Sequence, residues 1–165
     1  MPIYCAGDAP VVLHLMSVPQ SIIAIVYDYD QTLSPNYMQE EAIFPHFGID
    51  GRQFWQRCGD LVQKHGFEHE LAYMKALLDY LEPDRPTNAQ LRELGAKLSF
   101  FPGIPHMFEE FKSGLLTPEH QAHGIGVEHY IVSSGLKELI VGSRIEPYVR
   151  KIFGCEYAED NDGHI

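Results

Sequence analysis

The feature that most limits how this chain can fold is an apolar run that ends at two carboxylates. Residues Ile22–Tyr27 read IIAIVY, and the chain continues DYDQT from Asp28 to Thr32 before a turn-forming LSP. A short, continuously apolar run bounded by turn residues predicts a strand buried on both faces, as in the interior of a parallel sheet. We therefore expect Asp28 and Asp30 to lie at the carboxyl end of a buried strand.

Two later runs complete the predicted sheet. HYIVSSG, from His129 to Gly135, predicts a second strand. CEYAE, from Cys155 to Glu159, predicts a weaker third strand that is entered from a helical-looking EPYVRKIF. The stretch between the first two strands has helical periodicity instead. Strands that alternate with helices indicate an α/β fold with a parallel sheet and crossover connections.

The helical stretch contains recognisable helix starts. Asp50 with Gln53, and Thr87 with Gln90, have the spacing of capping boxes. The segment LLTPEHQAHGIGVE is predicted to be a loop. Apolar stripes at helical spacing are expected at Leu71, Met74, Leu78 and Leu81 before Pro83, and at Ile104, Met107, Phe108 and Phe111 after the turn FFPGIP.

The helices from about residue 37 to residue 98 exceed what a single crossover between parallel strands requires. We expect them to form a separate cap over the carboxyl edge of the sheet. The predicted organisation is an N-terminal extension at 1–20, an α/β core at 21–33 and 99–165, and a helical cap at 34–98.

Composition limits the partners of the chain. Its 165 residues suit one compact domain or a core with an inserted subdomain. A net charge of −11 makes DNA and RNA poor partners, but a small phosphorylated substrate needs only a local positive site or a bound cation. No apolar run approaches the roughly 20 residues that span a bilayer, so no membrane partner is expected. The three cysteines form no CxxC pair and no secretory signal is evident, which favours a cytoplasmic location.

Two carboxylates at this spacing can divide the work of phosphoryl transfer. Asp28 would attack phosphorus, and Asp30 would protonate the leaving oxygen and then take a proton from water. Ligands of an open parallel sheet bind outside the carboxyl ends of its strands, so Ser133 is expected to face the same site. Thr32 offers a second hydroxyl to the loop or to a phosphoryl oxygen. Carboxylates that face a phosphate need a cation, and an all-oxygen ligand set favours Mg²⁺.

These segments resemble a known family. IVYDYDQTL is similar to motif I of the haloacid-dehalogenase-like (HAD) hydrolase superfamily, HYIVSSGL to its motif II, and FFPGIPHMFEEF to the segment that re-enters the core after a C1-type helical cap. The resemblance implies a Rossmann-like core, a nucleophile at Asp28, and a general acid/base at Asp30. It implies Mg²⁺ held by the Asp28 side chain and the Asp30 carbonyl, and phosphate binding by Ser133 together with Ser134 and Gly135. The second carboxylate is typical of the phosphatases of this family.

The chain departs from the family pattern at several positions. Gln31 stands where glycine is commoner. The family also uses a lysine that neutralises the nucleophile and phosphate, and neither Lys137 nor Lys151 stands where that lysine belongs. An acidic pair normally completes the Mg²⁺ shell, but Asp160 and Asp162 lack a preceding strand, so EDNDGH is predicted to be a hairpin or surface loop. We therefore expect a C-terminally truncated chain with an incomplete core and weak turnover.

Other residues have simpler interpretations. His65 and His69 lie four residues apart without the HExxH pattern, and His120 and His123 lack a partner at zinc spacing, so surface positions are expected. Trp55 is expected in the core of the cap, although the cap surface that faces the site can recruit it.

The predicted function is Mg²⁺-dependent hydrolysis of a small phosphorylated metabolite through an aspartyl-phosphate intermediate. A second hypothesis is a catalytically inactive HAD-like fragment that acts as a binding or interaction module. A receiver-like domain, which also carries an aspartate at a strand end, is a third, but its first strand leads directly into a helix rather than a long insertion. An exposed edge of the first strand would favour self-association into a homo-oligomer.

Overall fold

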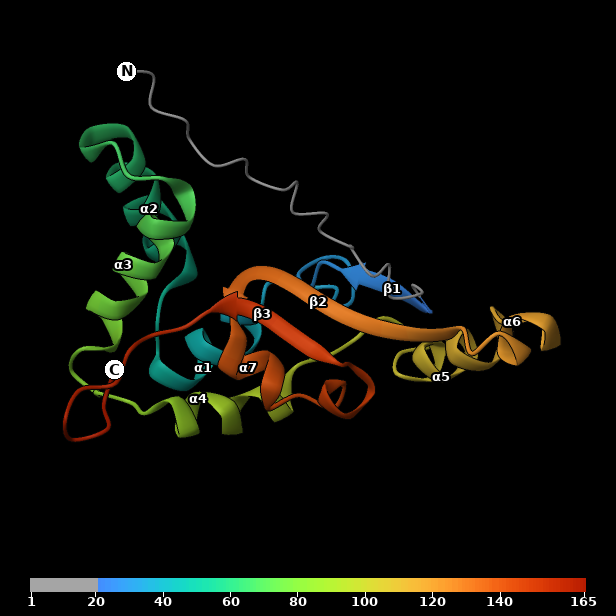
Figure 1. The fold of residues 1–165 in the computed structure, drawn as a ribbon. Coiled ribbons are helices and arrows are strands. Elements are labelled where there is room, and N and C mark those ends of the chain that lie inside the picture. Colours follow the sequence, from blue (N-terminus) through green and yellow to red (C-terminus); the bar gives the residue numbers. More distant parts are fainter. Residues whose placement is uncertain (1–20) are drawn as a thin grey trace, which may run out of the picture.

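The computed structural model describes residues 21–165, and the extension predicted at 1–20 lies outside the described residues. Three parallel strands form a sheet in the order β1-β2-β3. Helices fill the long connections between the strands, so the predicted α/β class with a parallel sheet is confirmed (Figure 1). The strands are β1 (Ile22–Tyr27), β2 (Gly126–Leu136) and β3 (Lys151–Cys155).

β1 and β2 are neighbours, as the predicted site requires. Tyr27 pairs with Ile131 of β2, and Ile131 pairs in turn with Ile152 of β3. Side chains alternate across a strand, so Val127, His129 and Ile131 share one face of the sheet, and all three are buried there. The helices packed against this side of the sheet are α5 (His106–Gly114) and α7 (Lys137–Val141).

His129 is a polar residue within this buried face. Its Nε2 lies 3.0 Å from the carbonyl oxygen of Phe108 in α5, and its Nδ1 lies 3.1 Å from the hydroxyl of Tyr27 in β1. A neutral ring satisfies both contacts when Nε2–H donates to the carbonyl and the tyrosine donates to Nδ1. Burial lowers the pKa of His129, which favours this neutral form.

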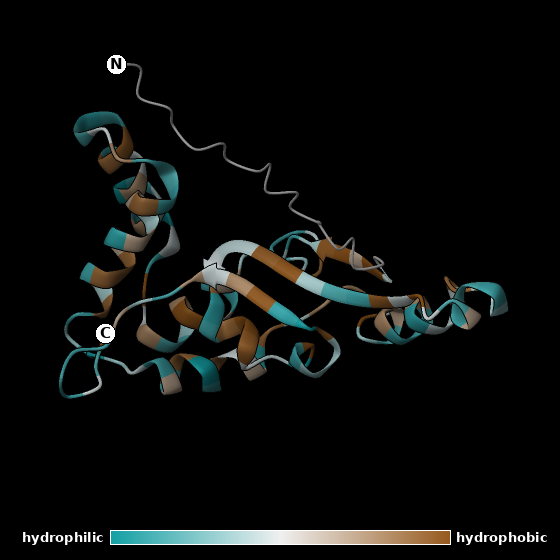
Figure 2. Cartoon of the chain, viewed as in Figure 1, coloured by the Kyte–Doolittle hydropathy of each residue, from teal (hydrophilic) through white to brown (hydrophobic). Residues whose placement is uncertain are grey.

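The prediction that β1 is buried on both faces is wrong for the described residues. Among residues 21–165, β1 is an edge strand paired only with β2, and Ile22 and Val26 are 49% and 59% exposed. The helices around the sheet lie on the opposite face, where the Tyr27 ring meets Phe108 edge-on at 5.5 Å. Figure 2 accordingly shows β1 as a strand with hydrophobic residues along most of its length, and a face of it is uncovered.

Helices α2 and α3 pack on each other beyond the carboxyl ends of the strands (Figure 1). The Asp50 side chain accepts the Gln53 N–H, so the predicted start of α2 is confirmed. Within residues 21–165, no helix is both long and apolar enough to cross a membrane. The two helices are α2 (Gly51–His65) and α3 (His69–Leu81).

The apolar stripe predicted for α3 is wrong for two of its four residues, whereas Leu81 is buried and Met74 packs against the core. Leu71 is 61% exposed and Leu78 is 37% exposed. α3 carries two overlapping apolar stripes, and the one that packs includes small alanines, which allow α2 to approach closely. The buried residues of α3 are Ala72, Tyr73, Ala76, Leu77 and Leu81.

The helices between residues 34 and 98 fall into two groups. α4 lies against α7 under the sheet rather than with the α2–α3 pair, and η1 also contacts α4. The contact between α4 and α7 is close, because a Cβ built on Gly142 would lie 1.6 Å from the carbonyl oxygen of Arg92. Thr87 and Gln90 form both bonds of the predicted capping box at the start of α4. This group contains η1 (Gln39–Ile43), α1 (Phe44–Phe47), α4 (Asn88–Leu94) and η2 (Gly95–Lys97).

The last strand lies earlier than predicted. The expected strand at Cys155–Glu159 is wrong, and β3 takes up the second half of the segment that looked helical. Pro147 lies in a single turn, η3 (Glu146–Tyr148), and the Arg150 N–H then donates to the His129 carbonyl, which brings the chain alongside β2. The predicted loop after α5 contains one short helix, α6 (Pro118–Ala122), capped by the side chain of Thr117.

Candidate active site

The two carboxylates lie where the strand pattern predicts. Tyr27 is the last residue of β1, so Asp28 follows directly at the carboxyl end of the strand. The partner of Tyr27 is Ile131, and Ser133 lies two residues farther along β2. Asp28 and Ser133 therefore come from adjacent parallel strands at the same edge of the sheet.

A tight turn holds Asp28 and Asp30 together. The N–H groups of Thr32, Leu33 and Ser34 all donate to the carbonyl oxygen of Tyr29. The hydroxyl of Thr32 donates to Oδ2 of Asp28 across 3.3 Å, so this predicted residue supports the carboxylate. Gln31 has a φ of 59°, in the left-handed region where glycine is preferred, so glycine would adopt this backbone conformation more readily.

Asp30 is a partly buried carboxyl that also accepts a backbone hydrogen bond. Its Oδ1 accepts the Met38 N–H at 2.9 Å. Burial raises the pKa of Asp30 to about 6, with smaller upward effects from the charges of Asp28 and Glu41 and a downward one from the Met38 hydrogen bond. A carboxyl with a pKa near neutrality can hold a proton and release it during a reaction.

Ser133, Ser134 and Gly135 occupy the irregular end of β2, where the register to β3 shifts. The Gly135 N–H donates to Ser133 Oγ across 3.0 Å, which leaves the serine hydroxyl free to donate to a ligand. A Cβ on Gly135 would lie 2.3 Å from Cε of Met38, so only glycine fits here without displacing Met38. Met38 thus links the loop of Asp30 to the end of β2.

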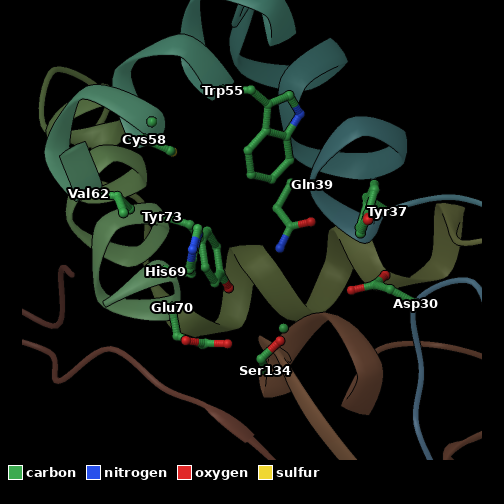
Figure 3. Close-up of a pocket in the computed structure, with 12 residues that line it drawn as sticks. Asp30, Tyr37, Gln39, Trp55, Cys58, Val62, His69, Glu70, Tyr73 and Ser134 are labelled. Atoms are coloured by element: carbon green, nitrogen blue, oxygen red, sulfur yellow. The ribbon is translucent and has the colours of Figure 1, made fainter. Parts of the chain in front are cut away.

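A cavity of about 430 Å³ opens beside Asp30. Three of the predicted site residues line it, namely Asp30, Ser134 and Gly135. Asp28, Thr32 and Ser133 do not line it. Figure 3 shows residues of the core and of the α2–α3 pair on opposite sides of this cavity. The other lining residues are Tyr37, Gln39, Trp55, Cys58, Gly59, Val62, His69, Glu70 and Tyr73.

Sequence reasoning missed two buried polar residues of this cavity, Gln39 and Tyr73. Gln39 follows Met38 and precedes Ala42 and Ile43, so it lies on the apolar side of its helix. The sequence signal that could have identified Gln39 is a polar residue at a position of the helix where the pattern expects an apolar one. Tyr73 had no such signal, because tyrosine is also an ordinary core residue.

The donor atoms present fit magnesium better than a transition metal. Among residues 21–165, no cluster of three or more His, Cys, Asp or Glu side chains is arranged to hold a metal. The four histidines of the two predicted pairs, 65 with 69 and 120 with 123, are all exposed. Asp28 is an exposed carboxylate, and a magnesium ion that keeps several waters needs only one or two protein carboxylates with substrate phosphate.

The lysines and aspartates near the end of the chain contact residues outside the candidate site. Lys137 pairs with Glu156, and the Lys151 ammonium lies 4.9 Å from the centre of the Phe153 ring. Oδ1 of Asp160 accepts the N–H groups of Asp162 and His164, which makes the turn predicted for this segment. Asp160 also pairs with Arg85, so the turn is fastened next to the α3–α4 connection.

Comparisons with known proteins identify the fold. No family model matches the chain. An uncharacterized protein of Borreliella burgdorferi is 33% identical over 153 residues, which cover 87% of this chain and 53% of that protein. The crystal structure of a HAD family hydrolase from Salmonella enterica serovar Typhi matches with a TM-score of 0.54 at 13% identity. The match covers 86% of this chain and 43% of the Salmonella chain.

The chain therefore has a HAD-like fold and spans about half the length of the proteins it matches. The predicted Rossmann-like core is confirmed as the fold class. At 13% identity the structural match concerns the fold alone, and residue roles rest on the geometry of this chain.

Proposed function

We propose that this chain has the chemistry of a Mg²⁺-dependent HAD-like phosphatase with a C1-type cap, acting on a small phosphorylated metabolite in the cytoplasm. One observation carries the proposal. An exposed carboxylate, Asp28, and a carboxyl with a raised pKa, Asp30, lie two residues apart at the open edge of a parallel sheet. Perturbed carboxyl groups of this kind are concentrated at functional sites.

In the proposed first step, an oxygen of Asp28 forms a bond to phosphorus as the bond from phosphorus to the leaving oxygen breaks. Asp30 gives its proton to that oxygen, so an alcohol leaves and an acyl phosphate remains on Asp28. In the second step Asp30, now ionised, takes a proton from water as the water attacks phosphorus. Asp28 is released as a carboxylate, phosphate departs, and Asp30 is protonated again.

The surrounding residues have supporting roles in this proposal. Thr32 orients Asp28 through its hydrogen bond, and Ser133 offers its free hydroxyl proton to a phosphoryl oxygen. The Asp28 side chain and the Asp30 carbonyl would hold Mg²⁺, which when bound neutralises charge on the phosphate.

Hydrolysis of an aryl phosphate in the presence of Mg²⁺ tests the proposal, with Asp28→Asn and Asp30→Asn measured beside the unaltered chain. We expect slow turnover that Asp28→Asn abolishes and that Asp30→Asn reduces by about 10²- to 10⁴-fold. Phosphate bound covalently to the peptide that contains Asp28 should be detectable by mass spectrometry. Turnover that survives Asp28→Asn would reject Asp28 as the nucleophile.

A second candidate function is a binding module without turnover. The observation that favours it is the charge of the cavity, because none of the lining residues is a lysine or arginine that would compensate a phosphate. Binding of phosphorylated ligands without hydrolysis, in a folded chain with Mg²⁺ present, would support this alternative.

A further inference from the structure

The cavity beside Asp30 contains two buried polar atoms that the proposed reaction does not use. Gln39 is only 3% exposed, and its Oε1 has no hydrogen-bond partner among the described residues. Tyr73 is 8% exposed, and its hydroxyl has the Gln39 side chain as a hydrogen-bonding neighbour. Buried polar groups are almost always paired in folded proteins. The unpaired Oε1 of Gln39 on this cavity therefore indicates a ligand that supplies the missing donor.

The charge of the cavity limits what that ligand can be. The lining includes the carboxyl groups of Asp30 and Glu70 and contains no lysine or arginine. An anionic group at this place would be repelled, and a cation would be attracted. The unpaired Gln39 Oε1 can only accept a hydrogen bond, so the ligand must also bring a donor.

Aromatic rings complete the lining. Tyr37 and Trp55 have ring centroids 5.9 Å apart, and Figure 3 shows the Trp55 indole above the Gln39 side chain. The indole N–H donates to Glu40 across 2.7 Å, which fixes the ring and places another carboxylate beside it. Aromatic faces attract ammonium groups.

From these contacts we propose that the cavity binds the ammonium group of an aminoalkyl phosphate. The inference rests on the proposed function, since it places the phosphoryl group at Asp28 and the alkyl chain in the cavity. The ammonium donates to Gln39 Oε1 and to the Tyr73 hydroxyl oxygen, and the Trp55 ring and the Glu70 carboxylate provide electrostatic attraction. A volume of about 430 Å³ suits a small ligand of this kind.

Calorimetric binding to the Asp28→Asn chain tests the proposal without depending on turnover. The probes are three phosphates of equal length that differ in the terminal group: 2-aminoethyl, 2-hydroxyethyl and 2-carboxyethyl phosphate. We expect the amino compound to bind at least about tenfold more tightly than the hydroxyl compound, because hydrogen bonds from charged groups are stronger than neutral ones. The carboxyl compound should bind most weakly. Equal or tighter binding of the hydroxyl or carboxyl compound would overturn the proposal.

Two variants locate the ammonium group. Gln39→Met keeps an unbranched side chain of similar length but removes the acceptor, and it should lose most of the preference for the amino compound. Tyr73→Phe should lose part of that preference, and it provides an independent test if Gln39→Met fails to fold. Gln56→Met, at an exposed position of α2, is the matched control and should retain the full preference. A preference unchanged in a folded Gln39→Met or Tyr73→Phe chain would place the ammonium group elsewhere.

The outcomes separate this inference from the proposed function. Preferential binding of the amino compound without hydrolysis by the unaltered chain would reject the phosphatase function and keep the ligand site. Hydrolysis of all three compounds with equal binding would keep the phosphatase function and reject the ligand site.

Discussion

Replacement of Asp30 by asparagine should stabilise the folded chain at neutral pH while it removes the proposed acid. Asparagine keeps the oxygen that accepts the Met38 N–H but carries no charge. The folded state then no longer has to hold a partly buried carboxylate beside the charges of Asp28 and Glu41. Asp30→Asn therefore separates the cost of the buried charge to stability from the role of the carboxyl as the proposed acid.

The size of the effect follows from the pKa of Asp30, which rises from its ordinary value of 3.8 to about 6 in the folded chain. A shift of this size corresponds to at most about 3 kcal/mol, and screening by solvent at a partly exposed group reduces it to about 2 kcal/mol. The folded state binds the proton more tightly than the unfolded state, so stability falls as the pH rises from about 4 to about 6. Above pH 6 the full penalty is present, and below pH 4 it vanishes.

Urea titrations between pH 4 and pH 8, followed by far-UV circular dichroism, measure this difference. Asp30→Asn should be more stable than the unaltered chain by about 2 kcal/mol at pH 7 and about equally stable at pH 4. The single tryptophan, Trp55, reports on α2 in the same titrations by fluorescence. Asp84→Asn, in the exposed turn after α3, is the matched control and should change little at any pH. A loss of stability at pH 7, or a difference that is the same at pH 4 and pH 7, would refute the assigned burial penalty.

Substitutions at four further positions test the fold around the site by thermal and urea denaturation. Gly142→Ala should destabilise the chain by about 3 kcal/mol, because the added carbon would meet the Arg92 backbone; near-normal stability would contradict the close contact of α4 and α7. Gly66→Ala should destabilise the chain by about 1 kcal/mol, because Gly66 ends α2 with a φ of 71°. Gly59→Ala should stabilise it by about 0.5–1 kcal/mol, because Gly59 lies inside the same helix and an added Cβ meets no atom within 4 Å. If Gly66→Ala and Gly59→Ala changed the stability in the same direction, α2 would not end at Gly66. Thr87→Ala should cost about 1 kcal/mol through loss of its capping bond, and Thr87→Ser should recover most of it.

Features that depend on neighbouring residues could be predicted from the sequence. The strand at Ile22–Tyr27 and the caps at Asp50 and Thr87 involve residues within a few positions of each other, and the structure contains all of them. The burial of β1 could not be predicted in the same way. An apolar run indicates that a strand can be covered on both faces, but whether it is covered depends on distant segments, and Val26 stays exposed.

The same distinction applies to α3. Its sequence offers one apolar stripe through Leu71 and Leu78 and another through Ala72 and Ala76, and hydrophobicity alone favours the leucines. The alanines pack because small side chains bring α2 and α3 close together, and this depends on the shape of α2. Periodicity therefore predicted the helix correctly but its buried face only in part, since Leu81 is buried and Leu71 is not.

At the site, sequence patterns located the carboxylates but not their environment. A strand end followed by a turn is enough to place Asp28 and Asp30 together. The pKa of Asp30 depends first on its burial and then on Met38 and Glu41, which lie just before and within η1. No spacing rule predicts that this segment returns to the loop of Asp30. The unpaired Oε1 of Gln39 is likewise evident only once the surrounding side chains are placed.

The burial of Asp30 thus has opposite effects on folding and on the proposed reaction. The same desolvation that costs about 2 kcal/mol at neutral pH raises the pKa to about 6, where the carboxyl can give and take a proton near pH 7. An Asp30 that was fully exposed would cost the fold nothing but would remain ionised and could not protonate the leaving oxygen. Met38 moderates this balance, because its N–H stabilises the carboxylate form and keeps the pKa from rising farther. Met38 also packs against Gly135, so a larger residue at position 135 should disturb this hydrogen bond and raise the pKa of Asp30. The limb of the pH–rate profile on which activity falls as Asp30 ionises should then move to higher pH, even though Gly135 itself carries no reactive group.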